Sequence, residues 1–154
     1  MKILRLYVAA AVGGACLMAA LPAAAADGLV ALTSPRPAKE TMDRLEALVQ
    51  ARGLKVFARI DHAAGASTVG QALRPTELLI FGNPQGGTPM MLCAQTAGID
   101  LPLKALVWQD ASQQVWVGYN EPTFIAQRHG AADCPAVGAL SKALTGLVEA
   151  TVAP

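Results

Sequence analysis

The sequence has few of the residues from which catalytic and metal sites are usually built. Of its 154 residues only two are histidines and three are cysteines, and charged residues make up 15%. His62 and His129 stand far apart, and no two possible ligands have a local spacing such as C-x-x-C or H-x-x-x-H. No serine lies in the nucleophile turn motif of a hydrolase. These absences argue against a metal, a cofactor and a nucleophilic triad.

Runs of basic residues are also absent, and neither sign of charge is in large excess. The 12 lysines and arginines nearly balance the 11 aspartates and glutamates. Nucleic acids and anionic membranes attract clustered positive charge, so neither is expected as a partner. The sequence contains no internal repeat and no linker-like stretch, which favours a single domain.

The N-terminus has the form of a bacterial secretory signal. Lys2 and Arg5 precede an apolar stretch from Leu6 to Leu21, and small residues complete the segment. Removing residues 1–26 leaves residues 27–154 as a single domain. The loss of Lys2 and Arg5 then leaves 10 basic against 11 acidic residues. A retained membrane anchor is the alternative, although about 16 apolar residues are short for a span. We expect a periplasmic or secreted protein that is not membrane-bound after cleavage.

The cysteine count changes with this cleavage. Loss of Cys16 would leave Cys93 and Cys134 in an oxidising compartment. An even pair in a secreted domain favours a disulfide bond. Two unpaired buried cysteines, too far apart to bond, are the alternative.

Hydrophobic periodicity gives the expected order of elements. Strands are predicted at 29–33, 54–60, 78–81, 103–108 and 115–119, and helices at 38–51, 63–73, 90–97, 123–129 and from 135 onward. Asp61 is expected to cap the second of these helices. The order indicates an antiparallel sheet with helices packed on one face, which is an α+β fold.

The segment between the third and fourth strands is rich in turn residues. Thr88 followed by Pro89 has the form of a helix start, and Gly98 suits the left-handed residue that closes a helix. The glycine-rich stretch 82–89 also resembles an anion-binding loop, but it lacks the lysine and the spacing of a P-loop. A structural turn is the favoured interpretation.

Several motifs in fixed order resemble the family known as domain of unknown function 302. They are Glu40-Thr41 with Leu45, Phe57 to His62, Leu73 to Leu78, Phe81 to Pro84 with Gly87-Thr88-Pro89, Asp100 to Lys104, Val107-Trp108, and Tyr119-Asn120. The resemblance implies a TBP-like β-α-β(4)-α fold with a long C-terminal helix on one face of the sheet. It also implies a homodimer. It carries over no catalytic residues, because none are established for the family.

A few residues are candidates for chemistry or binding. Asp61 and His62 form a possible acid–base pair, with Asn83 as a further partner, although Asp61 as a helix cap and His62 as a packing residue is the favoured interpretation. Arg74 is expected to pair with Glu77 or Asp61, or to add positive charge near the glycine-rich loop. Candidate ligand-binding residues are His62, Arg74, Asn83, Trp108 and Tyr119.

We therefore predict a non-catalytic module that binds an unknown small ligand or a protein. An apolar pocket enclosed by the sheet and the long helix is expected, with Trp108, Trp116, Tyr119 and Phe124 as its lining. One alternative is an enzyme that uses Asp61 and His62. Another is a redox role for Cys93 and Cys134, which requires an exposed and readily reduced bond.

Overall fold

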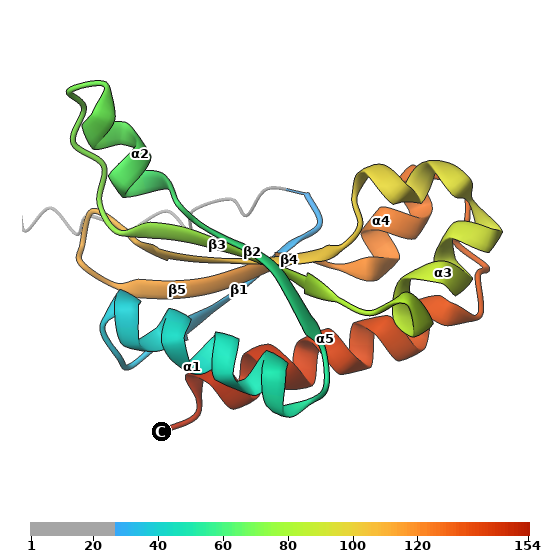
Figure 1. Cartoon of the computed structure of the whole chain (residues 1–154). Coiled ribbons are helices and arrows are strands. Elements are labelled where there is room, and N and C mark those ends of the chain that lie inside the picture. The colour runs from blue at the N-terminus through green and yellow to red at the C-terminus, as the bar shows by residue number, and fades with distance from the viewer. Residues whose placement is uncertain (1–26) are drawn as a thin grey trace, which may run out of the picture.

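The computed structural model describes residues 27–154, and the predicted signal peptide lies outside this range. Five strands form one antiparallel sheet in the order β1-β5-β4-β3-β2 (Figure 1). The strands are β1 (Leu29–Ser34), β2 (Lys55–Asp61), β3 (Thr76–Gly82), β4 (Leu103–Gln109) and β5 (Val115–Asn120). The helices are α1 (Ala38–Ala51), α2 (His62–Thr68), α3 (Pro84–Cys93), the 3-10 helix η1 (Gln95–Ile99), α4 (Pro122–Arg128) and α5 (Ala136–Val152). The predicted β-α-β(4)-α order of an α+β domain is confirmed, with α2, α3, η1 and α4 as insertions.

Helices α1 and α5 lie side by side on one face of the sheet (Figure 1). Helix α1 has the predicted bounds, and Met42, Leu45 and Val49 at helical spacing are fully buried. The predicted stripe of α5 is also buried, including Leu144, Leu147 and Val148. These side chains form the main core with the inward residues of the strands. Within the described residues, neither α5 nor any other helix combines the length and apolarity that a membrane span needs.

A second, smaller core lies beyond one end of the sheet. Met90 of α3, Ile125 of α4 and Leu140 of α5 belong to it, together with Ala97 of η1. Helix α5 therefore takes part in both cores: its N-terminal half packs under α3 and α4, and its C-terminal half packs under the sheet. The two cores meet near the C-terminal end of β3.

The other face of the sheet is not covered by α1 or α5 (Figure 1). Strand alternation places Leu78, Leu106 and Trp108 on this open face, next to inward-facing neighbours such as Leu79 and Val107. Trp108 and Trp116 are cross-strand partners and stack with ring centroids 6.2 Å apart. We call this surface the open sheet face.

The insertion α2 is shorter than the sequence predicts. Asp61 caps it as expected, because its Oδ1 accepts a hydrogen bond from the Ala64 amide at 2.8 Å. The helix ends at Thr68 rather than at Leu73. Gly70 follows with a φ of +72°, a left-handed conformation that glycine adopts without strain, and it turns the chain out of the helix.

The predicted start and end of α3 are both wrong. Asn83 is the N-cap, and its Oδ1 accepts from the Gly86 amide at 2.7 Å, while Pro84 takes the first helical position. Pro89 therefore lies inside the helix instead of at its start. The helix ends at Cys93, and Gly98 belongs to η1 rather than to a helix terminus. The sequence contains two helix-start signals of the same kind, Asn83-Pro84 and Thr88-Pro89. The helix begins at the first of them.

Candidate functional site

A cleft of about 980 Å³ opens between α3 and α5 at the C-terminal end of β3, where the two cores meet. It is lined by residues 52, 54, 57, 81–89, 91, 98, 101–103, 135, 136, 139, 140, 143, 144 and 147. The lining includes the buried core side chains Phe81, Leu144 and Leu147. A cleft of this volume accommodates a small organic molecule, since ligand pockets are usually about 300–1,000 Å³.

Small residues on facing elements keep this cleft open. Helix α5 presents Ala136, Ala139 and Ala143 to it, and α3 presents Gly86 and Gly87. A side chain on Gly86 would have its Cβ 3.5 Å from Cδ2 of Leu140 on α5. The hollow is thus a direct result of alanine and glycine at positions where larger apolar residues would bring α3 and α5 into full contact.

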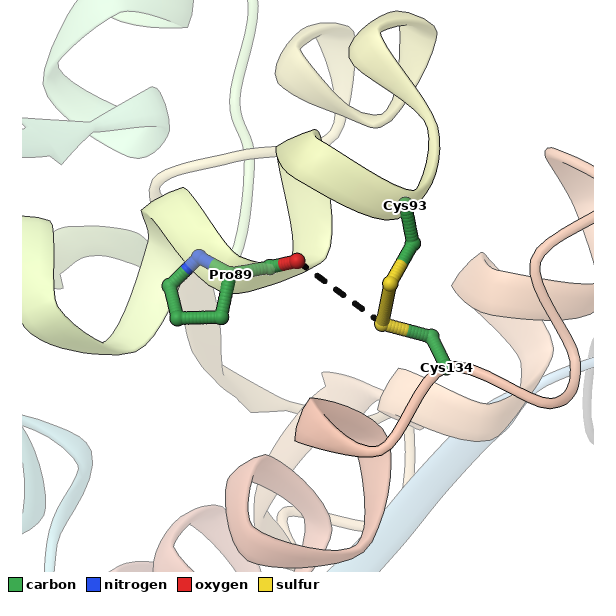
Figure 2. The surroundings of a disulfide bond; sticks show 3 residues. All are labelled: Pro89, Cys93 and Cys134. Atoms are coloured by element: carbon green, nitrogen blue, oxygen red, sulfur yellow. Dashed lines mark hydrogen bonds between the residues drawn. A yellow bond between two sulfur atoms is a disulfide. The ribbon is translucent and has the colours of Figure 1, made fainter.

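A disulfide bond links the two walls of the cleft. Figure 2 shows Cys93, the last residue of α3, bonded to Cys134, which lies two residues before α5, and their Cα atoms are 5.9 Å apart. Sγ of Cys134 also lies 3.8 Å from the carbonyl oxygen of Pro89. Cys134 is buried, whereas Cys93 is exposed. The disulfide bond therefore holds the end of α3 near the start of α5. One of its two residues, Cys93, is exposed to solvent.

Positive charge at the cleft comes from a residue that the sequence analysis did not single out. Arg52, the C-cap of α1, is exposed and lines the cleft. The nearby Lys55 places its Nζ 5.1 Å from the ring centroid of Phe57, another lining residue. The sequence showed Arg52 only as the residue that ends a helix, because the approach of α1 to α5 is a tertiary feature.

Of the predicted site residues, Asn83 lines the cleft and the others do not. His62 is exposed at the start of α2, and within residues 27–154 its ring makes no hydrogen bond to Asp61 or Asn83. Arg74 donates from Nε to the Gln109 carbonyl at 3.1 Å instead of pairing with Glu77 or Asp61. The arrangement that the enzymatic alternative requires is therefore absent from the described residues.

The four aromatic residues expected around a pocket lie elsewhere. Trp108 and Trp116 are on the open sheet face. Tyr119 points into the main core, where its hydroxyl is 2.9 Å from Oγ1 of Thr145. Phe124 packs directly over Gly28. The cleft exists, but aliphatic and small residues line most of it.

A further arginine, Arg59, is engaged in ion pairs away from the cleft. Arg59 donates from Nε to Glu77 at 2.6 Å and from Nη1 to Asp43 at 2.7 Å and Glu46 at 3.1 Å. The hydrogen bond to Glu77, followed by those to the other two carboxylates, raises the pKa of Arg59 above its ordinary value. Arg59 therefore ties α1 to β2 and β3, and it does not face the cleft.

One cluster of polar side chains was missed by the sequence analysis. His129 Nε2 lies 2.7 Å from Oδ2 of Asp100, and its Nδ1 lies 3.0 Å from Oγ1 of Thr96. Arg128 also reaches Asp100, at 3.2 Å. The cluster joins α4 to the η1 region, but Thr96, Asp100 and His129 do not line the cleft. No group of three or more metal-ligating side chains occurs among residues 27–154.

An antiparallel five-stranded sheet with two helices on one face and an apolar cleft at one end defines a small single-sheet α+β protein. The chain belongs to the family described as "Domain of unknown function DUF302", whose model matches residues 30–150. This confirms the resemblance seen in the sequence. The fold is similar to the crystal structure of an uncharacterized conserved DUF302 protein from Bacillus stearothermophilus. The TM-score is 0.66 at 21% identity, covering 82% of this chain and 97% of the other.

Curated relatives include proteins from Brucella. The chain is 49% identical over 102 residues to "Fluoride-specific ion channel FluC 1" of Brucella suis, a match that covers 66% of this chain and 40% of the relative. The same identity is found with "Fluoride-specific ion channel FluC 2" of Brucella melitensis, of which 38% is covered. The chain thus spans about two fifths of the length of the curated relatives it matches.

Proposed function

We propose that this protein is a non-catalytic periplasmic or secreted domain that binds an apolar small molecule in the cleft between α3 and α5. The observation that carries the proposal is the cleft itself, a volume of about 980 Å³ lined mainly by aliphatic and small residues. A pocket that is apolar with a few polar groups at its edge is the common form of a ligand site. The form of the first 26 residues supports the location outside the cytoplasm.

Polar groups in the cleft are few and suit orientation of a ligand rather than reaction. Asn83 uses its Oδ1 to cap α3, which leaves its amide hydrogens as donors. Gln85 and Thr88 are exposed lining residues with polar side chains. No pair of these groups has the base–nucleophile geometry that acid–base or covalent catalysis needs.

A neutral fluorescent probe tests binding in the cleft. The full chain, exported to a bacterial periplasm and purified, is titrated with N-phenyl-1-naphthylamine, which fluoresces in apolar sites. Ala143→Phe places a large side chain in the cleft, where it takes the space of roughly one ring of the probe. The probe then buries less apolar surface, and its binding is expected to weaken about tenfold. Ala64→Phe introduces the same side chain on α2, outside the cleft, and is expected to leave binding unchanged. Equal affinity in the wild type and both variants would contradict the proposal.

We also propose that the open sheet face is where a second copy of the chain binds to form a homodimer. The row Ile60, Leu78, Leu106, Gly118 and Ala31 crosses all five strands without a polar side chain. Among the described residues of β1, β3, β4 and β5, Lys104 is the charged one on this face, and its Nζ donates to the carbonyls of Asp100 and Pro102. A face without free charge does not repel an identical face, so it suits self-association.

The size of the open sheet face supports the same proposal. Five strands about 4.8 Å apart and six residues long give a face of roughly 24 by 20 Å. This projected area of roughly 480 Å² is more than half of the ~800 Å² that each partner contributes to a stable interface, so the face can form the centre of one. Native mass measurement tests the assembly: twice the mass of the mature chain supports the dimer, and a monomer at all concentrations contradicts it.

A further inference from the structure

The rim of the cleft carries positive charge that no carboxylate neutralises. Arg52 makes no ion pair within the described residues, whereas Arg59 and Arg128 do. None of the residues that line the cleft is acidic. This pattern is local, because the domain as a whole has nearly equal numbers of acidic and basic residues.

The guanidinium of Arg52 is held in a fixed place at this rim. Its Nη2 donates to the Gly146 carbonyl at 2.8 Å, and its Nη1 donates to the Ala143 carbonyl at 3.3 Å. Both acceptors belong to α5, so the side chain extends from the end of α1 to the opposite helix. These bonds occupy two of the five N–H donors of the guanidinium, and the others are available to a ligand.

Lys55 adds a second cation on the same side. It follows closely on Arg52 in the chain, and its Nζ lies over the ring of Phe57, which lines the cleft and is 49% exposed. An ammonium group over an aromatic face is stabilised by the ring and remains hydrated on its other side. The apolar cleft therefore has one edge where two permanent or nearly permanent positive charges face solvent.

We infer that the ligand of the cleft is an amphiphilic anion from solution, with an apolar body between α3 and α5 and its negative group at Arg52. This inference rests on the proposed function and adds the chemical class of the ligand. A guanidinium binds carboxylate, sulfonate and phosphate oxygens in a bidentate manner, while the apolar body is removed from water in the cleft. A small inorganic anion would leave the apolar cleft empty, and a neutral apolar molecule would leave the guanidinium of Arg52 without an anionic partner.

A matched pair of probes separates the two contributions. 1-Anilinonaphthalene-8-sulfonate and N-phenyl-1-naphthylamine share the same aromatic body, and only the first carries an anionic group. In the purified exported protein we expect the anionic probe to bind more tightly than the neutral probe, by about fivefold as is typical of one exposed charge pair. Raising the ionic strength from about 0.01 M to about 0.1 M is expected to reduce that advantage, because salt screens exposed charges.

Variants of Arg52 identify the group responsible. Arg52→Met keeps the apolar stem and removes the charge, so it is expected to weaken the anionic probe about fivefold and to leave the neutral probe unchanged. Arg52→Lys is expected to restore part of the difference. Arg74→Met is the matched control, because Arg74 is also exposed and also donates to a backbone carbonyl, but it does not line the cleft.

The outcomes distinguish this inference from the proposed function. If neither probe binds, the cleft is not a ligand site and both fail. If both probes bind equally and Arg52→Met changes neither, the cleft binds apolar molecules without help from the charge of Arg52, and the inference is overturned. Thermal unfolding of Arg52→Met is measured in parallel, since a purely structural role would lower stability and weaken both probes together.

A final comparison separates a free ligand from a lipid surface. Decanoate below its micelle concentration is expected to displace the anionic probe, and decanol at the same concentration to displace it less. The protein is expected to stay in solution with phosphatidylglycerol vesicles. Sedimentation with those vesicles, without displacement of the probe by decanoate, would assign the rim to a membrane surface and overturn the inference.

Discussion

At the scale of single residues, Asp110 organises the turn between β4 and β5. Its Oδ1 accepts from the Ser112 hydroxyl at 2.6 Å, the Ser112 amide at 2.8 Å and the Gln114 amide at 3.0 Å. Its Oδ2 accepts from the indole Nε1 of Trp116 at 2.8 Å. The carboxylate thus satisfies the donors of a hairpin in which Gln113 has a φ of +68°.

These bonds make a prediction about pH. The hydrogen bond from the Ser112 hydroxyl, then the one from Trp116, hold the pKa of Asp110 below its ordinary value of 3.8. A carboxylate with a lowered folded-state pKa stabilises the fold above its unfolded pKa, and this contribution is lost as the pH falls through the folded value. The indole N–H resonance of Trp116 should therefore shift with a midpoint below 3.8. In Asp110→Asn this transition should disappear, and a midpoint above 3.8 would contradict the assignment.

Residues were predictable from the sequence where their role was local. Asp61 was recognised as a cap because its partner is three residues away. Arg52 and the cluster around His129 were not, because their partners lie 94 and 29 residues away. Contacts between residues so far apart in the chain cannot be predicted from the spacing of residues in the sequence. A single arginine after a helix can have many roles.

At the scale of secondary structure, α3 is the element least able to form on its own. Its ten residues include Pro84, Gly86, Gly87 and Pro89, and glycine and interior proline both disfavour helix. The Asn83 cap fixes its start, the buried Met90 fixes its middle, and the disulfide fixes its end. The helix that forms one wall of the cleft thus depends on contacts outside itself.

Removing the disulfide is therefore expected to affect the cleft as well as stability. Cys93 and Cys134 are 41 residues apart, and closing a loop of this length stabilises by about 4 kcal/mol in the chain-entropy model. The double variant Cys93→Ser/Cys134→Ser should lose about that much unfolding free energy in denaturant titration. Backbone amides of α3 should exchange hydrogen faster because the helix opens locally. Amides of α1, which packs in the main core, should exchange faster only to the extent that the unfolding free energy of the whole domain falls.

A purely local role of the bond would give a different result. If the double variant retained both its unfolding free energy and the protection of α3, the disulfide would have no part in holding the cleft wall. The sequence indicated the pairing through the even cysteine count and the expected oxidising compartment. It placed the start of α3 five residues too late, because Asn83-Pro84 and Thr88-Pro89 carry the same local signal and tertiary packing decides between them.

At the scale of the whole molecule, the open sheet face is a broad apolar surface that neither α1 nor α5 covers (Figure 1). Ile60 is 39% exposed on edge strand β2, next to Leu78 of β3. In a symmetric dimer, Ile60→Glu would introduce a negative charge on each copy of the interface. We expect a shift toward monomer in sedimentation velocity, with the dimer weakened at least about tenfold, since unpaired charge in an apolar interface is costly.

A second exposed apolar residue provides the control for this experiment. Leu92 is 83% exposed on α3, a helix that packs in the smaller core beyond one end of the sheet, and Leu92→Glu should leave the assembly mass unchanged. If both variants remain dimeric, the two copies meet through another surface.

The fold class was predictable because each main strand and helix has its own hydrophobic period. Which side chains lie on the open sheet face was not predictable, because β3 and β4 carry apolar residues on both faces and show no clear alternation.

The position of β1 at the edge beside β5 has a consequence for biosynthesis. The first strand of the domain pairs with the last, so Leu29↔Asn120 joins residues that are separated by most of the chain. A polypeptide that emerges N-terminus first must hold an apolar strand without its partner until nearly the whole domain is available. Such non-local pairing delays completion of the fold. The sheet can therefore be completed only after β5 has been synthesised, and until then the edge of β5's future neighbour β1 stays unpaired.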